Sequence, residues 1–253
     1  MIQKRVLDII QIKNLKEENI FGIIGRMEML LKYFERHKKL HSQIPFLKVY
    51  YLVTKKVFEK NLEKKDYYNY PEKMDELDVH FCNLYFDALK PFLDSEKKKT
   101  PWKNYYSYCS SGKDFPFLEV LLGINSHINA DLCDVLAKLN YQEKRDFMKI
   151  NKILLEVIPD MIRYLFFEEK DFLGLGGLII PDLVEKEFKK TVVKWRKDAW
   201  KNSKKLKKNP RLKKDLYIQT ENLSKELIQI FENDLPLHPK RFLKRINKLK
   251  VKI

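Results

Sequence analysis

The chain has 253 residues, 44% of them hydrophobic, so there is enough apolar material for a core and global disorder is excluded. Seven glycines and ten prolines are too few for a β-sandwich or barrel, which needs a turn about every ten residues. The net charge is +16, and the composition as a whole predicts an all-α protein, a single-domain multi-helix bundle.

Three segments of the N-terminal half carry apolar residues at helical spacing. Asn19 can cap a helix over residues 20–34. Two further helices are predicted over 45–58 and 71–89, each beginning at a proline. Pro91 should end the third, because proline disrupts a helix interior.

The C-terminal half is also helical by its pattern, with one unusual connection. Residues 172–181 are rich in glycine but lack the lysine and the preceding strand of a nucleotide-binding loop, so we expect a tight connection there. Pro159 should interrupt or kink its helix. The predicted helices cover 117–139, 147–167, 182–206 and 216–231, and residues 239–253 form a short basic helix or a frayed end.

We divide the chain into three parts. Residues 1–70 form N-terminal helices packed on the main bundle, residues 71–235 form the helical bundle itself, and residues 236–253 form a basic C-terminal tail. The segment Lys186–Lys214 holds 14 basic and 2 acidic residues. Such a basic face can bind nucleic acid or an anionic surface, whereas a solvated lysine-rich surface is the alternative.

The cysteines and the N-terminus predict the compartment. There are three cysteines and no CxxC pair, which argues for reduced thiols. The N-terminus lacks the apolar region of a signal peptide, and no stretch reads as a transmembrane segment. We therefore expect a cytoplasmic protein.

The stretch Leu121–Leu132 places polar side chains inside an apolar helix. His127 and Asp131 are four residues apart and share one helix face, with Asn125 and Asn129 to either side. A carboxylate and an imidazole in an apolar setting can act as general acid and base or bind a metal ion. Alternatively, Asp131 only orients a core histidine and the asparagines connect neighbouring helices.

Two other polar features are candidates for the same site. Asn83 and Asp87 follow His80 along one helix, and two histidines with two aspartates would make a divalent metal site, although a solvated edge is the alternative for His80. Arg196 and Trp200 are four residues apart, so the guanidinium can lie over the indole. If that face points inward, Arg196 can also reach an anionic ligand.

The central stretch and its neighbours resemble a bacterial family of uncharacterised proteins, a domain of unknown function with the patterns LLGINAHINxDL and RxxAW. The first pattern corresponds to Leu121–Leu132, with Ser126 in place of alanine, and the second to Arg196–Trp200. The resemblance covers roughly residues 75–206; the N-terminal helices look peculiar to this chain and His80 lies outside the pattern. It implies an all-helical cytoplasmic protein and no particular activity. The resemblance also favours the interior polar residues over the lysines as the candidates for function.

Three functional hypotheses follow. In the first, a small-molecule enzyme or ligand-binding site uses His127 as base or metal ligand. Arg196 anchors an anionic group, and the other site residues orient His127, share a divalent metal or hold the substrate, namely Asp131, Asp87, Asn83, Asn125, Asn129 and Trp200. In the second, a non-enzymatic protein binds nucleic acid or anionic surfaces through Lys186–Lys214. In the third, the polar cluster is a purely structural network.

Overall fold

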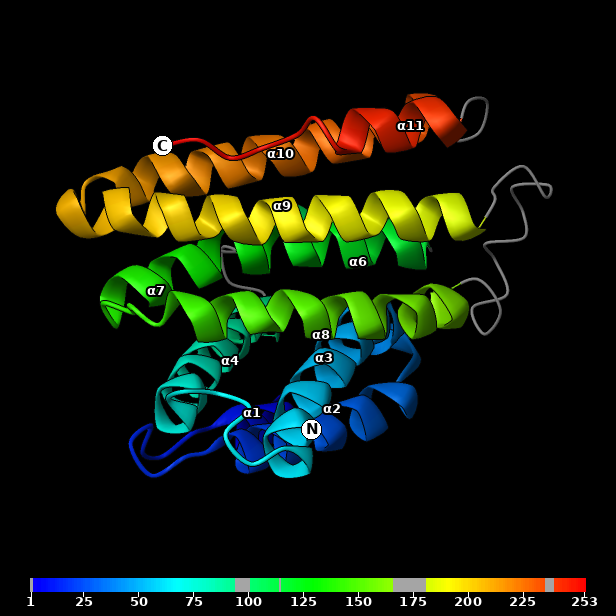
Figure 1. Ribbon diagram of the computed structural model, residues 1–253. Helices are drawn as coiled ribbons and strands as arrows, with labels where there is room; N and C mark the ends of the chain where they lie inside the picture. The colour runs from blue at the N-terminus through cyan, green and yellow to red at the C-terminus, as the bar shows by residue number, and fades with distance from the viewer. Residues whose placement is uncertain (1, 94–100, 114, 166–180, 235–238) are drawn as a thin grey trace.

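The computed structural model describes residues 2–93, 101–113, 115–165, 181–234 and 239–253. Within these ranges the regular structure is entirely helical and the helices pack as one body, which confirms the predicted all-α class (Figure 1). In chain order the elements are α1 (Ile2–Ile10), α2 (Ile20–Glu35), the 3₁₀ helix η1 (Lys38–Gln43), α3 (Ile44–Glu63), α4 (Pro71–Leu93), α5 (Lys103–Cys109), α6 (Pro116–Ile124), the π-helix η2 (Asn125–Leu132), α7 (Cys133–Lys138), α8 (Lys144–Arg163), α9 (Pro181–Lys208), α10 (Leu212–Asp234) and α11 (Pro239–Ile246).

The helices surround one continuous central helix, formed by α6, η2 and α7. Figure 1 shows α8, α9 and α10 running roughly parallel, with α6 behind them and α3 and α4 crossing below. The central helix contacts α3, α4, α9 and α10. Every residue from 116 to 133 is therefore buried, the polar side chains of this stretch included.

A glycine lets two of these helices approach closely. Gly123 in α6 lies against Phe46 in the first turn of α3, and a Cβ atom at position 123 would be 2.4 Å from the ring carbon Cδ2. Real Cβ contacts of that length do not occur, so the ring occupies space that only glycine leaves open. Position 123 thereby sets how far α3 sits from the central helix.

Local signals explain most helix boundaries, and two expectations need correction. Asn19 caps α2 as predicted, because its side chain accepts a hydrogen bond from the Gly22 amide at 2.9 Å. Pro91 does not end α4, which continues to Leu93. Because Pro91 lies in the last turn of α4, its missing N–H removes only a backbone hydrogen bond of that turn. Pro159 lies inside α8 without interrupting it.

The C-terminal tail is docked rather than frayed. After α11 the chain runs back along α9, where the Trp195 indole N–H and the Lys194 ammonium both donate to the Leu249 carbonyl, at 3.2 and 2.8 Å. The glycine-rich connection predicted at 172–181 lies outside the described residues except for Pro181. The three-part division of the chain stays a prediction, and α3 from its first part contributes core side chains beside the central helix.

Candidate functional site

The π-helix η2 carries the polar cluster. Its residues Asn125 to Leu132 are all buried, and π-helical turns are rare and found often at functional sites. His127 and Asp131 are 3% and 4% exposed. The imidazole Nδ1 lies 3.1 Å from Asp131 Oδ2, so the predicted pairing of these two side chains on one helix face is present.

A tryptophan from another helix completes this pair. The indole N–H of Trp102, at the N-terminal end of α5, donates to Asp131 Oδ2 at 2.9 Å. An indole nitrogen can only donate, which fixes the carboxyl oxygen as its acceptor. The same oxygen of Asp131, Oδ2, thus accepts from Trp102 and orients the ring of His127.

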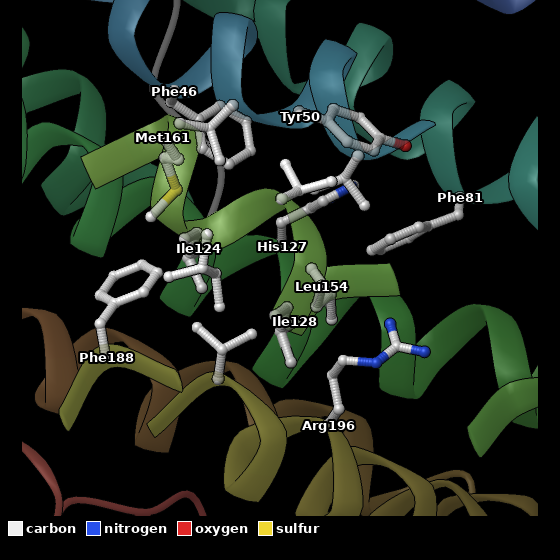
Figure 2. A pocket seen from close by; sticks show the side chains of 15 residues that line it. Phe46, Tyr50, Phe81, Ile124, His127, Ile128, Leu154, Met161, Phe188 and Arg196 are labelled. Carbon is white, nitrogen blue, oxygen red and sulfur yellow. The ribbon is translucent and has the colours of Figure 1, made fainter. Parts of the chain in front are cut away.

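Aromatic rings enclose the imidazole. The Phe81 ring from α4 stacks on it with centroids 3.6 Å apart and planes 6° from parallel. Tyr50 from α3 meets its edge at 4.4 Å, and Phe46 lies at 5.8 Å. Figure 2 shows His127 projecting toward Tyr50 and Phe81. The other ring nitrogen, Nε2, is buried and has no hydrogen-bond partner among the described residues.

Burial controls the charge state of the pair. It lowers the pKa of His127 well below its usual value, and the positive charge of Arg196 lowers that pKa further. Burial also raises the pKa of Asp131 well above its usual value, against the effect of the Trp102 hydrogen bond. Both shifts favour uncharged side chains. The proton between Nδ1 and Oδ2 therefore belongs to the pair as a unit.

A cavity of about 70 Å³ opens beside His127. Its walls come from α3, α4, the central helix, α8 and α9, and they are almost wholly apolar (Figure 2). The lining residues are Phe46, Val49, Tyr50, Val53, Phe81, Ile124, His127, Ile128, Leu154, Val157, Ile158, Met161, Phe188, Val192 and Arg196. An apolar cavity with a few convergent polar groups is the usual form of a small-molecule site.

Arg196 is the second polar group at this cavity. The residue is 6% exposed, and its Nε and Nη2 donate to Asn151 Oδ1 and the Phe147 carbonyl at 2.9 and 3.3 Å. The guanidinium lies 4.4 Å from the centre of the Phe147 ring, so it stacks there rather than on Trp200 as predicted. Burial lowers the pKa of Arg196 to about 10, and the side chain remains a cation at neutral pH.

Sequence reasoning missed Asp78. This half-buried residue of α4 lines a smaller cavity of about 40 Å³ together with Arg196, and its Oδ2 is buried without a partner among the described residues. Burial, followed by the charge of Asp75, raises the pKa of Asp78 to about 7. A signal was present, because Asp78 falls on the buried repeat of Met74 and Phe81.

The asparagines of η2 face a different neighbour. Asn125 Nδ2 donates to the Thr220 carbonyl at 2.9 Å and to Ser224 Oγ at 2.8 Å, both in α10. Asn129 Nδ2 donates to Asn125 Oδ1 at 2.9 Å. The two amides therefore connect the central helix to α10, and His127 lines the cavity without them.

The remaining predicted site residues lie elsewhere. Asn83 and Asp87 do not enter the interior: they bond each other on the outer side of α4, and Lys90 pairs with Asp87 at 2.6 Å. The expected shared interior is corrected, because this face of the helix is polar along its length. Trp200 is half-buried, 4.8 Å from Phe147 and below the ammonium of Lys204. Trp195 is the fully buried tryptophan of that helix.

Among the described residues, no three His, Cys, Asp or Glu side chains gather so as to hold a metal ion. No helix in this part of the chain is both long and apolar enough to cross a membrane.

Comparison with known proteins places the chain in a family. Residues 20–231 match DUF5995, a family of unknown function. No curated protein and no solved structure matches the chain. The matched region includes α2 and α3, so most of the N-terminal helices that looked peculiar to this chain are part of the family region; that the two quoted patterns are family features stays a prediction. The chain belongs to DUF5995, as the resemblance predicted.

Proposed function

We propose that the protein binds a small molecule in the cavity beside His127, with the imidazole Nε2 as a polar contact. The observation that carries this proposal is the buried Nε2 atom, which lacks a partner among the described residues. A buried polar atom left unpaired costs about 1–3 kcal/mol, so a polar group on a ligand would remove that cost. A network that only fixed helix register would be expected to pair this nitrogen, as it pairs Asn125 and Asn129.

The Asp131–His127 pair also suits acid–base chemistry, so we extend the proposal to a small-molecule enzyme. With Asp131 ionised, Nδ1 carries the proton and Nε2 is a base. With Asp131 protonated, its hydroxyl donates to Nδ1 and Nε2–H is a donor. The site can therefore accept or donate a proton at Nε2 while one hydrogen shifts between Nδ1 and Oδ2.

Isobutanol tests the binding proposal, because it pairs a compact apolar body with one hydroxyl. Titration is followed by the indole N–H resonance of Trp102, which is hydrogen-bonded to Asp131. We expect saturable binding to the native protein and binding at least fivefold weaker to His127→Leu, since the hydroxyl loses its partner. The unfolding free energy of that variant should change by only about 1 kcal/mol.

The control is His80→Leu, which removes a histidine from the outer part of α4 and should leave binding unchanged. Native-like binding by His127→Leu would contradict the proposal. Loss of several kcal/mol of stability in His127→Leu, with no isobutanol binding by the native protein, would instead favour a purely structural network.

A second candidate function is binding of an anionic macromolecule by the segment Lys186–Lys214. It is favoured by an open depression beside α9 that is lined by five lysines. They are Lys189, Lys190, Lys194, Lys197 and Lys201. Phosphates of a nucleic acid or of an anionic lipid surface are the groups that such lysines attract.

Salt dependence tests this second candidate. The native protein and the double variant Lys197→Gln/Lys201→Gln are titrated with a single-stranded DNA oligonucleotide and with anionic vesicles. We expect affinity for one probe to fall steeply with salt and the slope of log K against log salt to decrease by about one to two in the variant. Equal slopes for both proteins would exclude these lysines as the contact.

A further inference from the structure

Arg196 is a buried cation without a buried anion as its partner. Its hydrogen bonds go to a neutral amide and a backbone carbonyl, and no carboxylate of the described residues forms an ion pair with it. Burying an uncompensated charge is unfavourable. The position is therefore suited to an anionic group that arrives with a ligand.

Asp78 does not fill that role. It lines the 40 Å³ cavity with Arg196, yet its buried Oδ2 accepts no hydrogen bond from any described residue. Burial also favours its neutral form. Arg196 thus has no ion-pair partner among the described residues, although it lines the same small cavity as Asp78.

The cavities limit the size of the ligand. Arg196 lines both the 70 Å³ cavity and the 40 Å³ cavity, which also share Tyr50, Val53 and Phe81. Cavities of this size leave room only for a molecule with a short carbon chain. The larger cavity becomes purely apolar away from His127 and Arg196, toward Met161 and Phe188 (Figure 2).

Resting on the proposed function, we propose that the ligand is a short-chain monocarboxylate, whose carboxylate pairs with Arg196 and whose apolar tail lies toward Met161 and Phe188. The planar guanidinium matches a carboxylate in shape and charge. A phosphate is larger and carries more charge than this single buried cation can balance. His127 lines the same cavity, and when Asp131 is protonated its Nε2–H is available there as a hydrogen-bond donor.

Isobutyrate and isobutanol provide the test, because they share a carbon skeleton and differ in charge. Each is titrated into the native protein, Arg196→Met and Arg196→Lys, again with the Trp102 indole resonance as the readout. We expect isobutyrate to bind the native protein more tightly than isobutanol does. It should bind Arg196→Met about ten- to hundredfold more weakly, the effect of losing a charged hydrogen-bond partner, and Arg196→Lys at an intermediate level. The affinity for isobutyrate relative to that for isobutanol should fall by a similar factor in Arg196→Met, which separates loss of the charge from a change in cavity shape.

The outcomes separate this inference from the proposed function. The monocarboxylate inference would be overturned if isobutyrate bound no more tightly than isobutanol, or if its affinity were unchanged in Arg196→Met. Isobutanol binding that depends on His127 would still support the proposed site. Binding of neither probe by the native protein would overturn both. If Arg196→Met does not fold, the native comparison of the two probes and the Arg196→Lys variant decide the question.

Discussion

The two sides of the π-helix η2 differ in how fully their polar atoms are paired. On the side facing α10, Asn125 and Asn129 join each other and bond Thr220 and Ser224. On the side facing α3 and α4, the hydrogen bonds end at His127, whose Nε2 is left without a partner among the described residues. A structural network closes on itself, because unpaired buried atoms are costly. We call the side facing α10 the closed side and the side facing α3 and α4 the open side. The open side is the one that can accept a further polar partner.

The largest expected loss of stability is on the side facing α10. Asn125→Ala removes three buried hydrogen bonds, those that Asn125 makes with the Thr220 carbonyl, Ser224 Oγ and Asn129 Nδ2. We expect a loss of about 3 kcal/mol in the free energy of unfolding, measured by urea denaturation. Isobutanol binding by the folded fraction should be unchanged.

Asn83→Ala is the matched control, since Asn83 makes its hydrogen bond to Asp87 on the surface. Its cost should be about 0.5 kcal/mol or less. Similar losses for the two asparagine variants would mean that the closed network adds nothing special to stability, and the comparison would fail.

An effect of opposite sign, a gain in stability, is expected on the side facing α3 and α4. The pKa of Asp78 is raised to about 7 in the folded protein, so between about pH 4 and pH 7 the folded state holds a proton that the unfolded state has released. This contribution to stability is present at low pH and is lost as the pH rises through about 7. Asp78→Asn should therefore be more stable than the native protein at pH 8.

The measurement is the difference in unfolding free energy between Asp78→Asn and the native protein from pH 4 to pH 8. It should rise with pH by up to about 1.4 kcal/mol per unit and level off above pH 7. The charged or titratable groups that influence Asp78 are Asp75 on its own helix, Arg196 on α9, and the tyrosines Tyr68 and Tyr141. A pH-independent difference would show that Asp78 is ionised throughout and already compensated.

The fold could be predicted from helical periodicity and helix caps, because both depend only on residues that are close together in the sequence. Asn19 and the pair His127–Asp131 lie where spacing predicted them, because residues four apart share a helix face. The partner Trp102 could not be derived in this way: it lies 29 residues from Asp131 and meets it only through tertiary packing.

Residues whose location was predicted wrongly or missed show that a polar residue cannot be assigned to the interior without knowing which face of the helix it occupies. Asn83 and Asp87 looked like interior groups because apolar residues surround them in sequence, yet they lie on the outer side of α4. Asp78 drew no prediction from the sequence, although it belongs to the buried repeat of the same helix. Counting each residue's phase against Met74 and Phe81 would have separated these cases.

A substitution at Gly123 would change the cavity beside His127 without changing its polar residues. The ring of Phe46, which lines the cavity, occupies the space beside position 123, where even a methyl group would lie 2.4 Å from the ring. The smallest substitution, Gly123→Ala, would have to displace that ring and would so change the shape of the cavity. Related chains that differ at this one position would therefore differ in the shape and volume of this cavity, with the same polar groups still in place.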